Sequence, residues 1–261
     1  MGRWMAMGIG VWVGVGCASA PAPLWEQQLV DLTHTFDEQT IYWPTETGFE
    51  LTTRSQGMTD EGYYYEAHSI STPEHGGTHL DAPVHFYEGR DTTDRVPLER
   101  LIAPGVVVDV RAACAADRDH RVGVSDLEAW EEAHGAIPAG AIVLLRTGFG
   151  RYWPDRERYM GTSKRGDAGG AELHFPGLDP AAVPWLAERE VGAVGLDTPS
   201  IDHGPSTHFE AHVALFERNI PAFENVAHLE RLPAQGFTVI ALPMKVGGGS
   251  GGPLRIIAAI P

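Results

Sequence analysis

The sequence predicts an α/β protein built as a single domain. Its 261 residues, of which 43% are hydrophobic and 21% charged, can bury one substantial core and do not require a second domain. From residue 105 onward, short apolar runs rich in β-forming residues alternate with helix-start signals. We find no repeat, heptad run or low-complexity linker that would divide the chain. The pattern leaves open whether helices cover one face of the sheet or both.

Five apolar runs predict buried strands. Each is short and nearly continuous in its hydrophobicity, as in strands that are covered on both faces. They are residues 105–110, 141–146, 191–196, 237–242 and 254–258. The glycine-rich stretch 247–252 is expected to join the last two strands flexibly.

Helix-start signals separate these runs. Ser125 and Glu128 form a capping-box pattern, and Asp179 followed by Pro180 places a cap before a proline at the first helical position. The three expected helices run from Ser125 to His134, from Asp179 to about Glu190 and from Thr207 to Arg218. The polar segment 150–175 is expected to be a long surface loop.

The first 20 residues have the pattern of a secretory signal peptide. Arg3 precedes an apolar stretch over 9–15, and small residues end at Ala20. The stretch is too short and too rich in glycine to span a membrane as a helix. We therefore expect an exported protein with a domain over 21–261 and no membrane span in it. Cleavage after Ala20 is favoured over lipidation at Cys17, for which the signal would end at residue 16.

Charge and cysteine content narrow the possible partners and sites. A net charge of -16 argues against a nucleic-acid partner, because phosphate binding needs a surplus of basic residues on one face. With Cys17 in the leader, Cys114 is the single cysteine of the remaining chain. A cysteine zinc site and an internal disulfide are then excluded, so a metal site must use histidines and carboxylates.

The densest group of chemistry-bearing residues lies within residues 75–85. It contains His75, His79, Asp81 and His85. Gly76, Gly77 and Pro83 argue against a helix, whereas in an extended segment these four residues share one parity and project to the same side. Three imidazoles and a carboxylate suit zinc or manganese, and the glycines allow a tight turn beside the ions. The alternative is a solvated histidine-rich surface loop.

A second group follows the strand expected at 191–196. Asp197 and Ser200 lie directly after it, where α/β proteins place functional loops. Four more potential ligands come next in the sequence: His203, His208, His212 and Glu224. Spacing alone does not rank these residues.

The 75–85 segment resembles the His-x-Gly-Thr-His-x-Asp-x-Pro-x-His signature of the cyclase-like metal-dependent amidohydrolases. This family includes bacterial kynurenine formamidase and isatin hydrolase. The resemblance extends from about Val30 to Ile260. It includes Val30–His34, Tyr42–Pro44, Leu144–Thr147, Gly195–Ser200, the pair His212 and Glu224, and Ala241–Lys245.

The resemblance implies a swivelling β/β/α fold with a mixed central sheet, a homodimer or higher homo-oligomer, and two divalent metal ions, zinc or manganese. By position, His75, His79 and Asp81 would hold the first ion, and Asp81 and Glu224 would bridge to a second ion that also takes His212. His85 would be the general acid/base rather than a ligand. Trp43 would flank the substrate, and His203 and His208 would not be ligands.

These assignments imply a hydrolase that cleaves a non-peptide C–N bond of a small aryl formamide or cyclic amide (lactam). Metal-activated water would attack the carbonyl carbon, while His85 would take its proton and return it to the leaving nitrogen. The segment 151–170 is expected to shape the pocket entrance. The alternative is a binding protein that holds a small carboxylate through the same ions without turnover. His85 favours the enzyme, because a binding site needs no acid/base.

Overall fold

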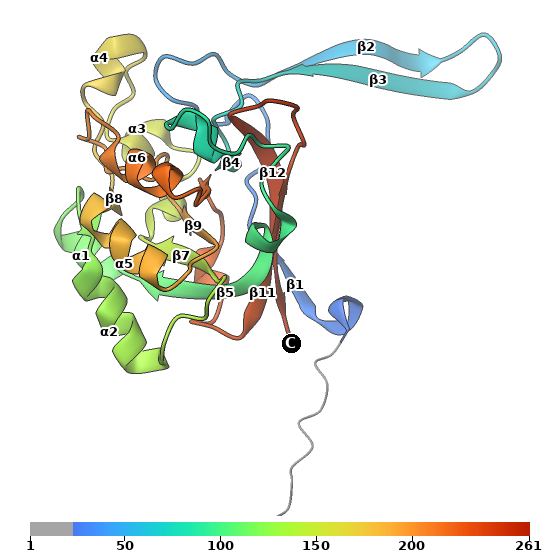
Figure 1. The fold of residues 1–261 in the computed structure, drawn as a ribbon. Helices are drawn as coiled ribbons and strands as arrows, with labels where there is room; N and C mark the ends of the chain where they lie inside the picture. The colour runs from blue at the N-terminus through green and yellow to red at the C-terminus, as the bar shows by residue number, and fades with distance from the viewer. Residues whose placement is uncertain (1–22) are drawn as a thin grey trace, which may run out of the picture.

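The computed structural model describes residues 23–261 and has a mixed sheet at its centre (Figure 1). The eight strands of this sheet run in the order β1-β12-β11-β5-β7-β9-β10-β4. In chain order they are β1 (Gln28–Asp31), β4 (His79–Asp81), β5 (Ile102–Asp109), β7 (Ile142–Arg146), β9 (Ala193–Leu196), β10 (Ala222–Glu224), β11 (Phe237–Pro243) and β12 (Gly251–Ile260). The five strands expected from the apolar runs are confirmed as β5, β7, β9, β11 and β12.

The sheet closes on itself through β12. The start of this strand pairs with β4 at Gly251–Pro253, and its end pairs with β1 over 257–260. Strands β5, β7, β9 and β10 are parallel to one another, while β4, β11 and β12 pair antiparallel with their neighbours. The result is a barrel-like mixed sheet in one α/β domain. The single α/β domain agrees with the sequence pattern, and the mixed sheet agrees with what the family resemblance implies.

Alternating residues of the parallel strands face two separate cores. Val107 and Leu144 point into the barrel, where they pack with Phe223, whereas Val106 and Leu145 face the helices. Both faces of these strands are therefore buried, which explains why their sequences are continuously apolar rather than alternating.

Six α-helices of the described chain lie on the outer side of β5, β7 and β9 (Figure 1). They are α1 (Arg111–Ala116), α2 (Val124–His134), α3 (Arg156–Met160), α4 (Gly166–Gly170), α5 (Val183–Glu188) and α6 (Glu210–Glu217). Short 3-10 turns are η1 (Leu24–Glu26), η2 (Pro83–His85), η3 (Leu98–Arg100), η4 (Phe149–Tyr152), η5 (Pro180–Ala182) and η6 (Leu229–Arg231). Among the described residues, none of the helices has the length and apolar character needed to cross a membrane.

Two of the expected helix starts are displaced. Helix α2 begins at Val124, because the Asp126 carboxylate accepts the Gly123 amide and makes Gly123 the cap in place of Ser125. Helix α6 begins at Glu210 rather than Thr207. The Asp179 cap is confirmed, since its carboxylate accepts the Ala181 amide, although the first turn is the 3-10 turn η5.

The expectation of a surface loop over 150–175 is wrong. The segment forms η4, α3 and α4, and it inserts four large side chains into the outer core: Tyr159, Met160, Leu173 and Phe175. These four apolar residues are spaced irregularly among polar ones, so no periodicity revealed them. The glycine-rich 247–252 stretch also differs from expectation, because β12 already begins at Gly251.

A long hairpin of β2 (Glu50–Met58) and β3 (Tyr64–Ser71) projects from the body (Figure 1). This hairpin and the short pair β6 (Arg121–Val122) and β8 (Gly177–Leu178) are two small sheets separate from the barrel. Leu51 pairs with Ile70, and Met58 pairs with Tyr64. All four of these side chains are exposed. The hairpin was not expected from the sequence, because its polar and apolar residues give no clear strand signal.

Candidate metal centre

Strand pairing brings three candidate ligands together at one edge of the barrel. In the antiparallel β4–β10 pair, Glu224 lies opposite His79 and Ala222 lies opposite Asp81. His79 and Asp81 point to the same side of β4, because they are two residues apart. All three candidate side chains, those of His79, Asp81 and Glu224, are buried.

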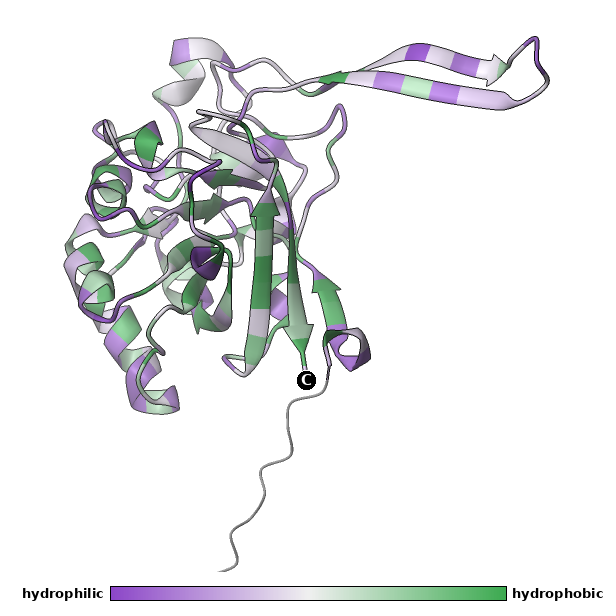
Figure 2. Cartoon of the chain, turned by 45° about the vertical axis from the view of Figure 1, so that its right-hand side comes forward, coloured by the Kyte–Doolittle hydropathy of each residue, from purple (hydrophilic) through white to green (hydrophobic). Residues whose placement is uncertain are grey.

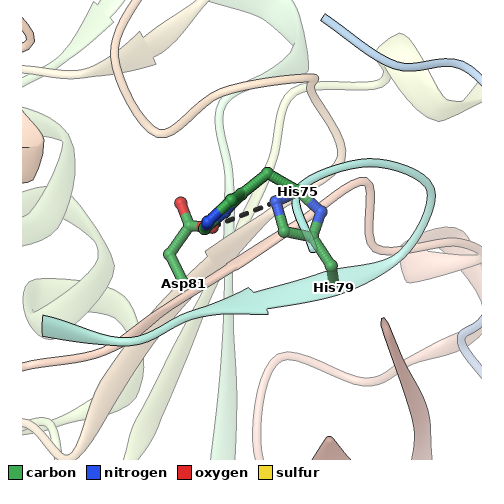
Figure 3. A group of neighbouring side chains, drawn as sticks. All are labelled: His75, His79 and Asp81. Carbon is green, nitrogen blue, oxygen red and sulfur yellow. Dashed lines mark hydrogen bonds and ion pairs between the residues drawn. The ribbon is translucent and has the colours of Figure 1, made fainter. Parts of the chain in front are cut away.

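His75 reaches the same point from the preceding loop rather than from an extended strand. Gly77, at φ +56°, turns the chain between His75 and β4. His75 packs against Gly251, where an added Cβ would lie 2.5 Å from its ring. The His75 and His79 rings converge on the Asp81 carboxylate (Figure 3). His75, His79 and Asp81 thus lie together as expected, but within the expected extended segment only 79–81 is a strand, and His85 lies in the 3-10 turn η2.

His212 approaches from helix α6 on the opposite side of Asp81. Its Nε2 lies 3.1 Å from Asp81 Oδ2 and 3.2 Å from Glu224 Oε1. Its Nδ1 lies 2.6 Å from Asp202 Oδ2. Asp202 also accepts the amides of Ala211 and His212, so one carboxylate fixes both the start of α6 and the imidazole that it carries.

Two groups of potential ligand atoms share Asp81. His75, His79 and Asp81 form one group, and Asp81, His212 and Glu224 form the other; within each group the atoms lie within 4.8 Å of one another. Asp81 Oδ1 lies 2.6 Å from His75 Nδ1 and 3.0 Å from His79 Nε2. Its Oδ2 faces His212, so the two oxygens of Asp81 serve the two groups separately.

The hydrogen bonding of His79 fits a cation ligand. Its Nδ1 lies 2.9 Å from the Gly77 carbonyl oxygen, to which it donates. Its Nε2 is fully buried and makes no hydrogen bond within the described chain, although it lies 3.0 Å from Asp81 and 3.5 Å from Glu224. A buried imidazole lone pair beside two carboxylates is the arrangement that a divalent cation satisfies.

The charges of the cluster point the same way. Burial lowers the pKa of His79, but Asp81 and Glu224 more than offset it and raise that pKa to about 9. Burial and the negative charge of Asp81 raise the pKa of Glu224. The raised pKa values of His79 and Glu224 show that the crowded carboxylates favour bound protons at this position. Divalent cations can replace these protons.

His85 lies beside the two groups without joining either. It ends the turn η2, and its ring stacks on the His75 ring at 3.7 Å between centroids and 13° between planes. No hydrogen bond to its ring nitrogens is formed within residues 23–261. Burial, together with the neighbouring histidines, lowers the pKa of His85 to about 3, although the charge of Asp81 opposes this shift. His85 therefore faces the cavity with its ring nitrogens outside both ligand groups.

The cluster forms the floor of a cavity of about 440 Å³. Trp43, Phe86 and Phe209 contribute aromatic walls, with the Phe209 ring 6.0 Å from that of Trp43 and 4.9 Å from that of Phe86. Trp43 is half-buried and lines the cavity. The cavity is large enough for a one- or two-ring aromatic molecule.

Other candidates from the sequence lie elsewhere. His203 and His208 belong to neither ligand group. Asp197 is buried and accepts the amides of Thr147 and Gly148, so it ties the loop after β7 to the end of β9. Ser200 lines the cavity, and the residue that follows it donates its backbone amide to Glu224 at 2.7 Å.

The sequence of the chain matches a known protein family. The model of the cyclase family matches residues 30–203. The chain belongs to this family. Isatin hydrolase from Roseibium aggregatum is 32% identical over 209 residues, which are 77% of each chain. Kynurenine formamidase from Salinibacter ruber is 29% identical over 233 residues, 88% of this chain and 96% of the relative.

Solved structures agree with this assignment to the cyclase family. An isatin hydrolase bound to the product analogue thioisatinate superposes with a TM-score of 0.80 at 29% identity, covering 91% of this chain and 94% of the other. Isatin hydrolase A from Ralstonia solanacearum superposes with a TM-score of 0.78 at 30% identity. The superposition covers 94% of this chain and 99% of the other.

Three supporting features of this cyclase-family site were missed from the sequence. Asp202 lies ten residues before His212, a separation that carries no signal until α6 folds back. The Ser250 hydroxyl lies 2.9 Å from His75 Nε2 and donates to Glu74 Oε2 at 2.7 Å, although 175 residues separate Ser250 from His75 in the sequence. The aromatic wall could have been predicted in part from the sequence, because Phe86 directly follows His85 and Phe209 directly precedes α6.

Replacing Asp202 with asparagine should weaken binding of a divalent cation at the cluster by about 10- to 100-fold, the usual effect of losing a carboxylate behind a histidine ligand. The amide oxygen of the variant side chain can still accept the α6 amides, so the fold should persist. A competition titration against a chromophoric chelator measures the affinity. Asp179→Asn is the matched control, because it removes a capping carboxylate that is no part of the cluster; equal affinities in both variants would contradict the role of Asp202.

Proposed function

We propose that this cyclase-family protein is a metal-dependent hydrolase that cleaves a non-peptide C–N bond of a small aromatic formamide or lactam. The single observation that carries the proposal is the sharing of Asp81 by two ligand groups on the floor of an aromatic cavity, with His85 beside them. The similarity to isatin hydrolase and to kynurenine formamidase supports it.

His75, His79 and Asp81 would hold one divalent ion, and Asp81, His212 and Glu224 a second, with zinc and manganese both suited to these ligands. When bound, such ions supply Lewis acidity and make water a stronger acid and nucleophile near neutral pH. Carboxylate, hydroxyl and carbonyl groups behind the ligands orient the imidazoles: Asp202, Ser250 and Gly77. Burial of the ligands keeps competing solvent away.

His85 would move the proton. At the edge of the cavity and beside the ligand groups, its imidazole can accept a proton from the attacking water and donate it to the leaving nitrogen. The second transfer matters because an amide nitrogen leaves poorly without a proton. Trp43 would stack on the aryl group of the substrate, and the rings of Phe209 and Phe86 continue the same aromatic wall.

Hydrolysis of isatin and of N-formylkynurenine, followed by absorbance, tests the proposed function. We expect turnover of at least one of the two, complete loss after chelation, and recovery on adding zinc or manganese. Metal analysis of the purified protein gives the stoichiometry, for which we expect two ions per chain. A protein that binds metal but hydrolyses neither compound nor related aryl amides would contradict the hydrolase proposal and favour a binding protein.

The variant His85→Ala should retain its metal content and lose about 10²- to 10⁴-fold in kcat, the contribution typical of a general acid/base. The reason is that His85 faces the cavity without joining either ligand group. His208→Ala, which replaces an exposed histidine outside both groups, is the control and should keep the wild-type rate. Unchanged turnover in His85→Ala would remove His85 from the mechanism.

We further propose that the protein is a homodimer or higher homo-oligomer in which the β2–β3 hairpin clasps a second copy. One face of the hairpin exposes four large side chains, those of Leu51, Met58, Tyr64 and Ile70. An isolated two-stranded hairpin is marginally stable in water, so a covering surface is expected. The helix-free outer face of β5, β11 and β12 offers one, where a row across neighbouring strands consists of Ile102, Ile240 and Ile257 (Figures 1 and 2).

Size-exclusion chromatography with light scattering tests this assembly. The double variant Leu51→Glu/Ile70→Glu should shift the protein to monomers, because it replaces an exposed apolar pair of the hairpin with charges. Thr52→Glu/Ser69→Glu adds the same charges to the opposite face of the hairpin and should leave the assembly intact. A wild-type protein that is monomeric at micromolar concentration would contradict the proposal.

We also propose export of the protein, on the sequence pattern of residues 1–20 alone. The predicted leader and its cleavage after Ala20 lie outside the described residues 23–261. N-terminal sequencing of the protein recovered from its native compartment would test both.

A further inference from the structure

The cavity has an uneven distribution of charge away from the metal ligands. Its aromatic walls are uncharged, and the charged groups among its lining residues, apart from the histidines and the candidate ligands, are Glu46 and Glu74. Among the described residues, no lysine or arginine lines it. Any charged substituent that a substrate carries into this part of the cavity would therefore meet carboxylates alone.

Glu46 lies at the end of the wall formed by Trp43. The Glu46 amide donates to the Trp43 carbonyl oxygen at 3.0 Å, which closes a turn, and Glu46 is an exposed residue that lines the cavity. The carboxylate of Glu46 makes no hydrogen bond or ion pair with residues 23–261. Its charge is thus not compensated by the described part of the protein.

Glu74 is fixed on the other side of the cluster. Its Oε2 accepts the Ser250 amide at 3.0 Å and the Ser250 hydroxyl at 2.7 Å. These neutral donors orient the carboxylate without cancelling its charge. Arg156 donates from Nη1 to the carbonyl oxygen of Tyr42, the residue before Trp43, at 2.9 Å. It does not line the cavity.

We infer that the site selects aromatic amides whose ring carries no anionic group, and that Glu46 is the residue that sets this selectivity. The inference rests on the proposed hydrolase function and narrows its substrate class. A carboxylate on a ring stacked against Trp43 would lose its water and approach Glu46 without gaining a cationic partner. A neutral ring of the same shape has no such penalty.

A matched pair of substrates measures this selectivity. On whichever scaffold the metal-loaded enzyme hydrolyses, the ring carries either a carboxamide or a carboxylate, as in 4-formamidobenzamide and 4-formamidobenzoate, or isatin-5-carboxamide and isatin-5-carboxylate. The two members have nearly the same shape and differ in charge. We expect kcat/KM of the wild type to favour the carboxamide by at least about tenfold, since charges a few ångströms apart near a protein surface interact by more than ~1.4 kcal/mol.

The variant Glu46→Lys should shift this ratio towards the carboxylate by at least about tenfold, and Glu46→Gln by an intermediate amount, because each removes or reverses the same charge. Glu132→Lys on α2, which makes the same charge change at an exposed position outside the cavity, should leave the ratio as in the wild type. Added salt should reduce the selectivity of the wild type.

Two results would overturn the inference: equal kcat/KM for the pair in the wild type, or a ratio that Glu46→Lys does not change. Calorimetric binding of the same pair to the metal-loaded protein separates this failure from failure of the proposed function. A preference for the carboxamide in binding without hydrolysis of either compound would support the selectivity and contradict the hydrolase. Equal affinities would contradict the selectivity whether or not turnover occurs.

Discussion

The position of β4 between β10 and β12 is the constraint on which the site depends. Pairing with β10 sets Glu224 opposite His79, and pairing with the start of β12 places Gly251 opposite Asp81, where the missing side chain leaves room for the His75 ring. A slip of one residue in either pair would turn His79 and Asp81 to the other side of the strand. Closure of the barrel and assembly of the candidate metal centre are therefore one structural event, because the same short strand performs both.

Such a concentration of ionisable groups is unfavourable without cations. Asp81 and Glu224 are buried side by side, and the protein supplies imidazoles rather than permanent positive charges to face them. Neutral or backbone groups behind the cluster orient two of these rings: the Gly77 carbonyl holds His79, and Ser250 contacts His75. His212 has a carboxylate, Asp202, directly behind it. The arrangement is stable only when cations or protons occupy its centre, which links metal binding to the integrity of the barrel edge.

The sequence predicted the elements whose signals are local. Continuous apolar runs predicted β5, β7, β9, β11 and β12, because a strand that is buried on both faces has apolar residues at consecutive positions of its own sequence. Gly76 and Gly77 gave the turn at His75. The contribution of His212 and Glu224 depended on family resemblance, since 131 residues separate His212 from Asp81 and no spacing rule spans that distance. Asp202, Ser250 and the core residues of 150–175 were missed because their roles arise from tertiary contacts.

The same geometry bears on how a product would leave. Hydrolysis of a lactam breaks the C–N bond and converts a neutral ring into an amine and a carboxylate, so negative charge appears where the substrate had none. Cations bound at the cluster would favour that charge, whereas the carboxylates of Glu46 and Glu74, which also line the cavity, would oppose it away from the ligand groups. An anion that leaves the cluster would meet repulsion, and no arginine of residues 23–261 lines the cavity to retain it. The acidic lining would therefore exclude anionic competitors on entry and, by the same charges, limit rebinding of the product.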